Sequence, residues 1–452
     1  MDTLRGFVRS VWHPASRLFA SDGADAYRTW TKPDAVSQSA ELRRITTRRT
    51  PPLQGRDHGS RVDFFELYWA DITADSTWGD FAQWFARLLW RKPMSSVPKR
   101  LRPLWGVLWW LALGVAGAPL VALNVAIANP QAMWWCVGSV VLSALVLLVG
   151  KSFLVRYFGD VARYVTPSPR NVRVRHAARR RGLELLQALH ANPDYERIVV
   201  VGHSLGSILA HDIVALAWEE ATRRIDMAGP MCAQALQQCE AAAADLDRCA
   251  DLGGPVSALA LRAYRDAQRE LLRVLSSGVD GWRVSDLVTL GSPLTHADVL
   301  LAESGDELQT KIDARELLRS PPIKEGVPPS FAYAPRSGNG KRFMHHAAAM
   351  AATRWTNLYD QPPSAWRFLH GDLISGPLAG LFGPGVLDVA VKPVAKHRLL
   401  PQHWMTHNAY WTLLTGTASN ASAGHLQALR HALNLTDDPA AEVQLLNLLA
   451  RS

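Results

Sequence analysis

One short segment in the middle of the chain constrains the fold more than any other. Residues 197–201 read Arg-Ile-Val-Val-Val, a continuous apolar run that is typical of a strand buried in a parallel sheet. The sequence Gly-His-Ser-Leu-Gly follows at once at positions 202–206, and residues 207–220 have the apolar spacing of a helix. The sequence therefore predicts a strand, a sharp turn and a helix in direct succession.

A Gly-x-Ser-x-Gly turn between a strand and a helix is the pattern of a nucleophile elbow. Because such a turn is strained, we expect small residues, Gly202 and Gly206, on either side of the serine. Ser204 would then expose its hydroxyl at a helix N-terminus, where the helix dipole favours developing negative charge. The backbone N–H of Leu205 is the expected oxyanion donor, and His203 is expected to pack or to line the pocket.

Further strand-like and helical segments alternate along the chain. The candidate strands are residues 62–69, 284–290, 354–359 and 386–394. Strands that alternate with helices predict an α/β protein with a mainly parallel sheet. Residues 223–282 are rich in Ala, Leu and Gln, and we expect a helical insertion there that could act as a lid.

Together these segments resemble the α/β-hydrolases, and within them the lipase-like serine esterases. Residues 290–294, Leu-Gly-Ser-Pro-Leu, resemble the Gly-Ser-Pro turn that ends the strand after the nucleophile helix. Residues 355–359 and 372–377 resemble the strand and loop that bear the catalytic acid, and residues 407–411 resemble the loop that bears the histidine. The resulting order of serine, aspartate and histidine is the one that α/β-hydrolases use.

The resemblance implies an α/β-hydrolase fold and a role for each of three residues. Ser204 would be the nucleophile, His407 the base that takes its proton, and Asp372 the carboxylate that orients the imidazole. Two alternatives stay open, namely Asp360 as the acid and His403 as the base. The resemblance implies neither a cofactor nor a metal.

Two long runs without charge lie between the candidate strand at residues 62–69 and the serine. Residues 103–128 and 132–150 each exceed or approach the roughly 20 apolar residues that cross a bilayer core of about 30 Å. Basic residues flank the pair: Arg91, Lys92, Lys99, Arg100 and Arg102 precede it, and Lys151, Arg156 and Arg163 follow it. The pattern predicts a transmembrane helical hairpin over residues 101–157, with both chain ends in the cytoplasm.

Charge and cysteine content exclude other classes of function. The net charge is 49 − 40 = +9, and much of it flanks the predicted hairpin, where anionic lipid would attract it. The other basic cluster, residues 170–181, lacks interleaved aromatic residues, so nucleic acid is not an expected partner. The 4 cysteines form no Cys-x-x-Cys pair, and neither a zinc site nor a disulfide framework is supported.

The start of the chain departs from the resemblance. α/β-Hydrolases open with a strand that ends in a His-Gly turn and supplies the second oxyanion donor, and nothing before Val62 resembles it. Residues 1–8 are similar instead to the helix that follows that turn. We therefore expect either that this sequence begins just after the opening strand, or that the strand and half of the oxyanion hole are absent.

These features predict five consecutive parts and two competing functions. Residues 1–100 are the N-terminal part of the hydrolase domain, 101–157 the hairpin, 158–222 the nucleophile strand, elbow and helix, 223–282 the insertion, and 283–452 the C-terminal part. The first hypothesis is a membrane-anchored serine esterase or lipase that cleaves lipid-like or small esters through an acyl-enzyme. The alternative is a catalytically impaired scaffold on the same fold, tethered to the bilayer.

Overall fold

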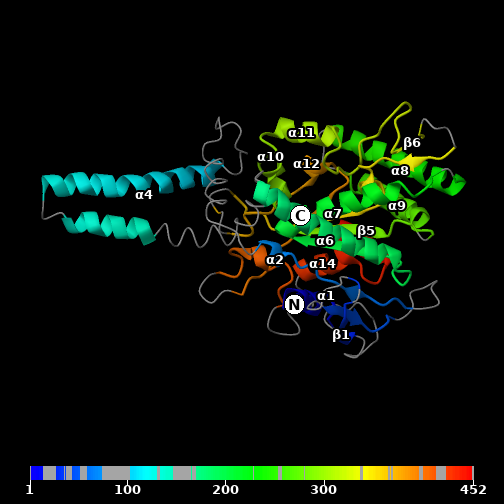
Figure 1. Cartoon of the computed structure of the whole chain (residues 1–452), viewed down its shortest axis with the longest axis horizontal. Coiled ribbons are helices and arrows are strands. Elements are labelled where there is room, and N and C mark those ends of the chain that lie inside the picture. The colour runs from blue at the N-terminus through cyan, green and yellow to red at the C-terminus, as the bar shows by residue number, and fades with distance from the viewer. Residues whose placement is uncertain are drawn as a thin grey trace. The chain divides into compact units, whose positions relative to one another are not determined.

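The protein is described by a computed structural model (Figure 1). Described are residues 2–13, 27–34, 36, 43–50, 59–73, 102–129, 133–145, 164, 169–227, 229–252, 257–278, 280–335, 340–364, 367, 370–396, 401–413 and 424–449. The chain divides into two compact units. The larger comprises Met1–Tyr68, Arg179–Gln361 and Leu369–Ser452, and the smaller comprises Trp69–Ala178 and Pro362–Phe368.

The larger unit is mixed α/β and contains one parallel sheet of 4 strands. Its strands are β4 (Ile198–His203), β5 (Val284–Leu290), β8 (Arg354–Tyr359) and β9 (Leu387–Ala390), and they lie in that order. Because all of them run in the same direction, their C-terminal ends meet at one edge of the sheet. The residues that follow β4, β5 and β8 are therefore brought together there.

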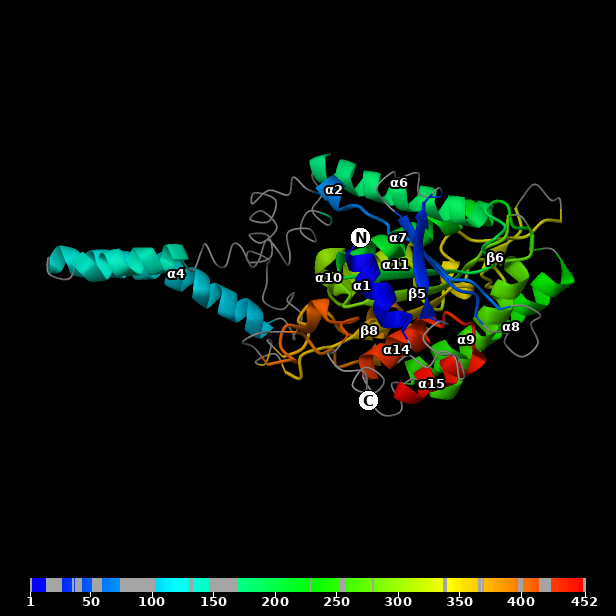
Figure 2. The ribbon, with the colours of Figure 1, turned by 90° about the horizontal axis from the view of Figure 1, so that it is seen from below.

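Helices cover both faces of this sheet. Figure 2 shows α7 (Leu205–Thr222) on one side and α14 (Gly424–Leu433) on the other, and both contact β5. Every residue of β5 is buried, including the polar Ser285, Asp286 and Thr289. Trp218 of α7 packs edge to face against Trp282, with ring centroids 5.1 Å apart, and both side chains are fully buried.

Buried ion pairs tie the N-terminal ends of the strands together. Asp286 of β5 accepts hydrogen bonds from Arg197, at 2.8 Å, and from Arg354 of β8, at 2.9 Å. Burial alone would raise the pKa of the Asp286 carboxyl, but these two guanidinium groups hold it well below its usual range. Arg265 and Arg354 both bind Glu442 from the C-terminal helix α15 (Pro439–Leu449). These charges are fully paired, as buried charges must be.

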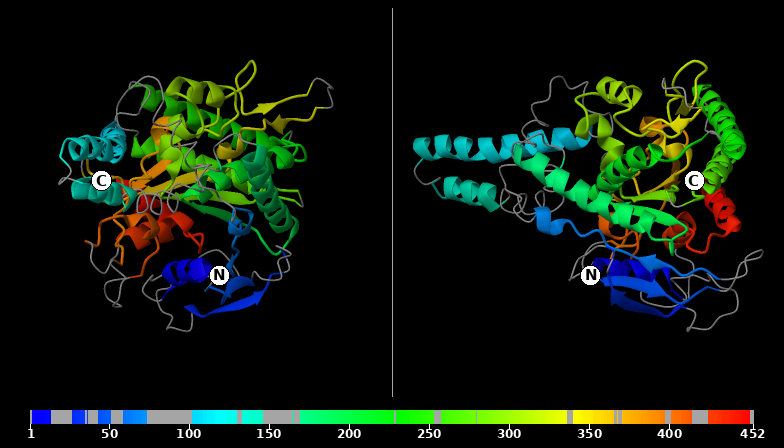
Figure 3. Two further views of the ribbon diagram at one scale, coloured as in Figure 1. Left: turned by 60° about the vertical axis from the view of Figure 1, so that its left-hand side comes forward. Right: turned by 45° about the vertical axis from the view of Figure 1, so that its right-hand side comes forward.

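A second, smaller sheet lies near the N-terminus (Figure 3). It consists of β1 (Thr29–Pro33), β2 (Arg43–Thr47) and β3 (Asp63–Phe64), all antiparallel. The strand expected over residues 62–69 is thus reduced to β3 and belongs to this sheet rather than to the parallel one. Within the described residues no strand pairs with the second edge of β4, and the opening strand of the resemblance is not seen there.

The N-terminal segment and the insertion are helical, as expected from their sequences. Helix α1 (Asp2–Val11) covers most of residues 1–8, and the insertion forms α8 (Pro230–Asp251) and α9 (Ala258–Leu275). Tyr264 and Gln268 of α9 donate hydrogen bonds to the Met350 carbonyl oxygen, both at 2.6 Å, just before β8 begins. Helix α9 therefore lies at the opposite end of the sheet from Ser204, and these contacts do not support a lid.

The remaining described elements are short or belong to connections. They are α2 (Ala70–Thr73), α6 (Pro169–Ala191), η5 (Pro293–His296), α10 (Ala297–Leu300), α11 (Gly305–Asp313), β6 (Ala332–Tyr333), β7 (Phe343–Met344), η6 (Ala349–Ala351), α12 (Ala379–Phe382) and η8 (Thr406–Asn408). Of these, η5, α12 and η8 matter most for the site, because they surround the loops that follow β5 and β8.

The transmembrane hairpin predicted over residues 101–157 is wrong. The smaller unit holds α4 (Arg102–Ala128) and a helical segment at residues 133–145, and neither is long and apolar enough, over its described residues, to cross a membrane. In α4, Pro119 and Asn124 interrupt the apolar residues. The predicted two-helix membrane localisation is contradicted by the same finding, and the flanking basic residues other than Arg102 lie outside the described residues.

Candidate active site

Ser204 occupies a strained turn between β4 and α7. Its backbone dihedral angles are φ 53° and ψ −131°, a region that costs a non-glycine residue about 1–3 kcal/mol. Two hydrogen bonds hold this conformation: the Ser204 N–H donates to the Leu290 carbonyl of β5, at 3.0 Å, and the Ser204 carbonyl accepts from Ser207, at 2.9 Å. The turn thereby places Ser204, half-buried, at the N-terminus of α7.

The two glycines of the motif have different surroundings. A Cβ atom at Gly202 would lie 2.6 Å from both the Gly206 carbonyl oxygen and the Ser207 Cα, far inside van der Waals contact. A Cβ atom at Gly206 would meet nothing within 4 Å. The steric reason for small residues thus applies at Gly202, where the strand passes directly beneath the first turn of α7, and does not apply at Gly206.

The structure brings together the three residues that the resemblance singles out. The Nε2 atom of His407 lies 2.8 Å from the Ser204 hydroxyl oxygen, and its Nδ1 atom lies 3.0 Å from Oδ2 of Asp372. With the proton on Nδ1, the imidazole donates to the carboxylate and accepts from the serine. Asp372 follows β8 and is buried, and His407 lies in η8 and is also buried. All three lie at the C-terminal edge of the parallel sheet.

The Asp372 carboxylate is held by further donors. Its Oδ2 accepts from the Tyr410 hydroxyl at 2.9 Å, and its Oδ1 accepts from the Ile374 N–H at 3.0 Å. Burial alone would raise the pKa of Asp372, but its charge interaction and hydrogen bond with His407, and the bonds from Tyr410 and Ile374, lower it. Asp372 is therefore ionised near neutral pH, as a residue that orients an imidazole must be.

His203 supports the histidine loop rather than the serine. Its Nε2–H donates to the backbone carbonyl of His407 at 2.8 Å. Its ring lies 4.9 Å from that of His407 and 4.8 Å, edge to face, from that of Trp411. Burial, followed by the neighbouring His407, lowers the pKa of His203 to about 4, so its imidazole is neutral above that pH.

The two alternative residues lie one layer further out. Asp360 accepts the Asp372 N–H on its carbonyl, at 2.6 Å, and the Thr406 hydroxyl on its carboxylate, at 2.5 Å. Burial, together with the charge of Asp372, raises the pKa of Asp360 to about 6. His403 shares a hydrogen bond with the Pro393 carbonyl, at 3.2 Å. In the described contacts neither residue reaches Ser204 or His407, so the geometry favours Asp372 as the acid and His407 as the base.

Sequence reasoning missed several residues that hold the histidine loop. Tyr410 was part of a recognised segment, but nothing in the sequence indicated that its hydroxyl reaches Asp372. Ser10 of α1 donates to the Trp411 carbonyl, and Phe7 packs edge to face on the Trp411 ring at 5.9 Å. These contacts join residues some 400 positions apart, and no local pattern could have indicated them.

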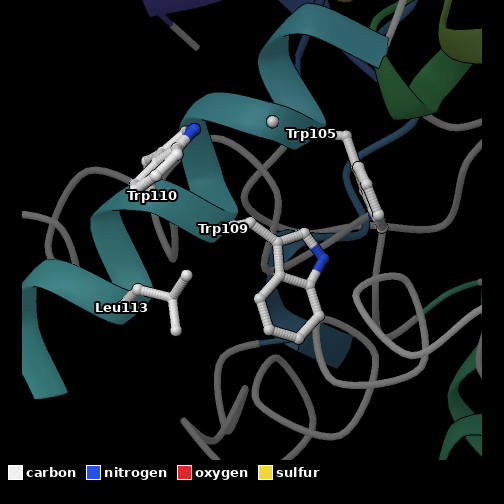
Figure 4. A pocket seen from close by; sticks show the side chains of 5 residues that line it. Trp105, Trp109, Trp110 and Leu113 are labelled. Carbon is white, nitrogen blue, oxygen red and sulfur yellow. The ribbon is translucent and has the colours of Figure 1, made fainter. Parts of the chain in front are cut away.

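Other features of the chain do not add to this site. Figure 4 shows a hollow lined by Trp105, Gly106, Trp109, Trp110 and Leu113, all from α4, and none of these side chains titrates. Within the described residues no group of three His, Cys, Asp or Glu residues is placed to hold a metal ion. Comparisons of the chain with protein-family models, with curated proteins and with solved structures found no match.

Proposed function

We propose that this protein is a serine hydrolase that cleaves carboxylic esters through an acyl-enzyme. One observation carries the proposal: the Ser204 hydroxyl, the His407 imidazole and the Asp372 carboxylate form a continuous hydrogen-bonded series, with distances of 2.8 and 3.0 Å. The nucleophile also lies in a strained elbow at a helix N-terminus, with backbone angles of a kind that clusters at functional sites.

In the first half of the reaction, Ser204 Oγ attacks the ester carbonyl carbon while His407 Nε2 takes the hydroxyl proton. The carbonyl oxygen becomes an oxyanion, and the new imidazolium is stabilised by Asp372 through Nδ1. His407 then gives its proton to the departing alkoxide. The C–O bond to the alcohol breaks, and the acyl group remains on Ser204 as an ester.

In the second half, a water molecule replaces the alcohol. His407 takes a proton from the water as the oxygen attacks the acyl carbon, and returns it to Ser204 Oγ as the acyl–serine bond breaks. A carboxylic acid leaves, and the enzyme regains its starting state. The Leu205 N–H, which opens α7, is the proposed donor to the oxyanion in both halves.

The proposed substrates are carboxylic esters without a narrower class. The preference for lipid-like esters depended on a membrane hairpin, which is contradicted, so membrane attachment forms no part of the proposal. The competing hypothesis, a catalytically impaired scaffold, does not require the serine, imidazole and carboxylate to be bonded in series. The hydrogen-bonded series therefore supports the enzyme over the scaffold.

A fluorophosphonate probe tests the proposal, because it reacts only with an activated serine. We expect the wild-type protein to be labelled and Ser204→Ala not to be labelled. Ser207→Ala is the matched control: it removes a serine from the same turn, one that bonds to the Gly202 carbonyl at 3.1 Å, and should keep its labelling. An unlabelled but folded wild-type protein would favour the scaffold.

A further inference from the structure

Tyr410 makes an unusual set of contacts for a residue outside the proposed triad. It is buried, with 1% of its surface exposed, and it follows His407 on the same loop. Its hydroxyl oxygen lies 2.9 Å from Oδ2 of Asp372 and 3.0 Å from Oγ of Ser375. It also accepts the Asp360 backbone N–H at 3.1 Å.

The direction of these hydrogen bonds follows from the chemistry of each group. The Asp360 N–H can only donate, and the ionised Asp372 carboxylate can only accept. A phenol has one proton, and a charged acceptor binds it more strongly than a neutral hydroxyl does. Tyr410 therefore donates to Asp372, and the Ser375 hydroxyl can donate to Tyr410.

The same carboxylate oxygen serves two donors. Oδ2 of Asp372 accepts from the Tyr410 hydroxyl and from Nδ1 of His407, at 2.9 and 3.0 Å. A stronger hydrogen bond from the Tyr410 phenol to this oxygen withdraws negative charge from it, so its hydrogen bond with the His407 imidazole becomes weaker. The phenol thus weakens the pull of the carboxylate on an imidazolium at His407.

The packing fixes this arrangement. Gly291, which follows β5, has a φ of 56°, and a Cβ atom there would lie 2.7 Å from the Tyr410 ring and 2.9 Å from Asp372 Oδ2. The Gly291 N–H in turn bonds to the Leu358 carbonyl of β8, at 3.1 Å. The Tyr410 ring and the Asp372 carboxylate therefore both pack against the backbone of Gly291, where a side chain would collide with them.

We propose that Tyr410 is a positioning residue whose hydroxyl fixes the Asp372 carboxylate and moderates its hydrogen bond to His407. The inference rests on the proposed hydrolase function and adds a fourth member to the series. Tyr410 touches no reacting atom, and it acts through Asp372. Removing its hydroxyl should make His407 more basic and leave Asp372 free to turn.

The titratable groups around this series come from several elements. His203 of β4 contacts His407, and Asp360, which follows β8, contacts Tyr410 through its backbone. Asp360 is itself influenced by His403 and Lys392. Asp360→Asn is therefore needed in the pH experiment, because it removes a neighbouring carboxyl whose pKa is raised to about 6 and whose titration would otherwise overlap the acidic limb.

The test is the pH dependence of kcat and KM for p-nitrophenyl acetate in the full-length protein. For Tyr410→Phe we expect kcat to fall about ten-fold, equivalent to about 1.4 kcal/mol, with KM little changed. We expect the acidic limb of kcat/KM to move to higher pH by roughly half a unit, and to do so in the Asp360→Asn background as well. Ser375→Ala, which leaves the bond from Tyr410 to Asp372 in place, should move the limb less than Tyr410→Phe does.

A second variant separates this effect from structural damage. Site-specific replacement of Tyr410 by a fluorinated tyrosine keeps the ring and strengthens the donor, so the acidic limb should move to lower pH. Opposite shifts in the two variants would support the proposal. An unshifted limb in both, in a protein whose activity depends on Ser204, would overturn the inference alone. Activity that is independent of Ser204 would overturn both the inference and the proposed function.

Discussion

Gly202→Ala should damage the elbow far more than Gly206→Ala, although both replace a glycine of the same motif. The added Cβ at position 202 would lie 2.6 Å from two backbone atoms of the helix that follows, whereas the Cβ at position 206 has open space. Backbone cannot turn aside as a side chain can. Overpacking of this kind costs about 1–3 kcal/mol, and the shift must move α7 away from β4.

That shift should appear in catalysis as well as in stability. Ser204 lies between the two glycines and meets His407 at 2.8 Å. A displacement near 1 Å between reacting groups can cost roughly 10²-fold in rate. Gly206→Ala should leave the rate within a few fold and could stabilise the chain by about 0.4–1 kcal/mol, because it reduces the entropy of the unfolded state.

Thermal unfolding and p-nitrophenyl acetate hydrolysis, measured on both variants, check this pair. The reasoning predicts a lower Tm and a loss of activity for Gly202→Ala, and neither for Gly206→Ala. Equal effects in the two variants would refute it, because the geometry that distinguishes them would then not exist in solution.

Three further predictions follow from the site. Asp372→Asn should lower kcat by about 10⁴-fold with little change in KM, since the amide would favour the wrong imidazole tautomer; steady-state kinetics with the folded variant check it. His203→Phe should destabilise the protein by about 1–3 kcal/mol, because the His407 carbonyl loses its buried donor; a urea titration measures this, and an unchanged midpoint contradicts it. Asp360 has a folded pKa of about 6, above the unfolded value near 3.9. Its stabilising contribution is therefore complete below about pH 4 and is lost as pH rises through about 6, so Asp360→Asn should flatten the pH dependence of unfolding in that window.

The sequence predicted those parts of the fold that depend on local pattern. The continuous apolar run before Gly202 indicated β4, but this strand lies at an edge of the described sheet and Val199, Val200 and Val201 are only partly buried, so the run overstated its burial. The strand-like segments at residues 284–290 and 354–359 indicated β5 and β8, which are buried over all or nearly all of their length. Spacing around Ser204 then indicated the turn and the start of α7.

Local sequence patterns did not predict where the helices pack in the fold. The insertion at residues 223–282 was correctly expected to be helical, but amphipathic spacing does not say which surface a helix covers, and α9 packs at the N-terminal end of β8. The apolar runs at residues 103–128 and 132–150 gave a strong membrane signal from composition alone. Helix length and polarity over the described residues do not support it.

In the candidate site, too, the sequence indicated individual residues but not the contacts between them. Asp372 and His407 could be named because their segments resemble known loops, yet their meeting depends on β8 and η8 lying at the same sheet edge. The sequence did not indicate that Tyr410 donates to the Asp372 carboxylate or that Asp360 binds the Asp372 backbone, since such buried hydrogen bonds have no sequence signature. Only the tertiary arrangement distinguishes Asp372, beside the imidazole, from Asp360, which lies behind it.

The most direct test of the central claim is to trap the acyl-enzyme. Wild-type protein is mixed with p-nitrophenyl acetate, quenched in acid within the first turnover, digested and analysed by mass spectrometry. The account predicts a burst of p-nitrophenol and a single acetylated peptide, modified at Ser204 and missing in Ser204→Ala. Turnover without acetylation of Ser204, or a burst that persists in Ser204→Ala, would contradict it.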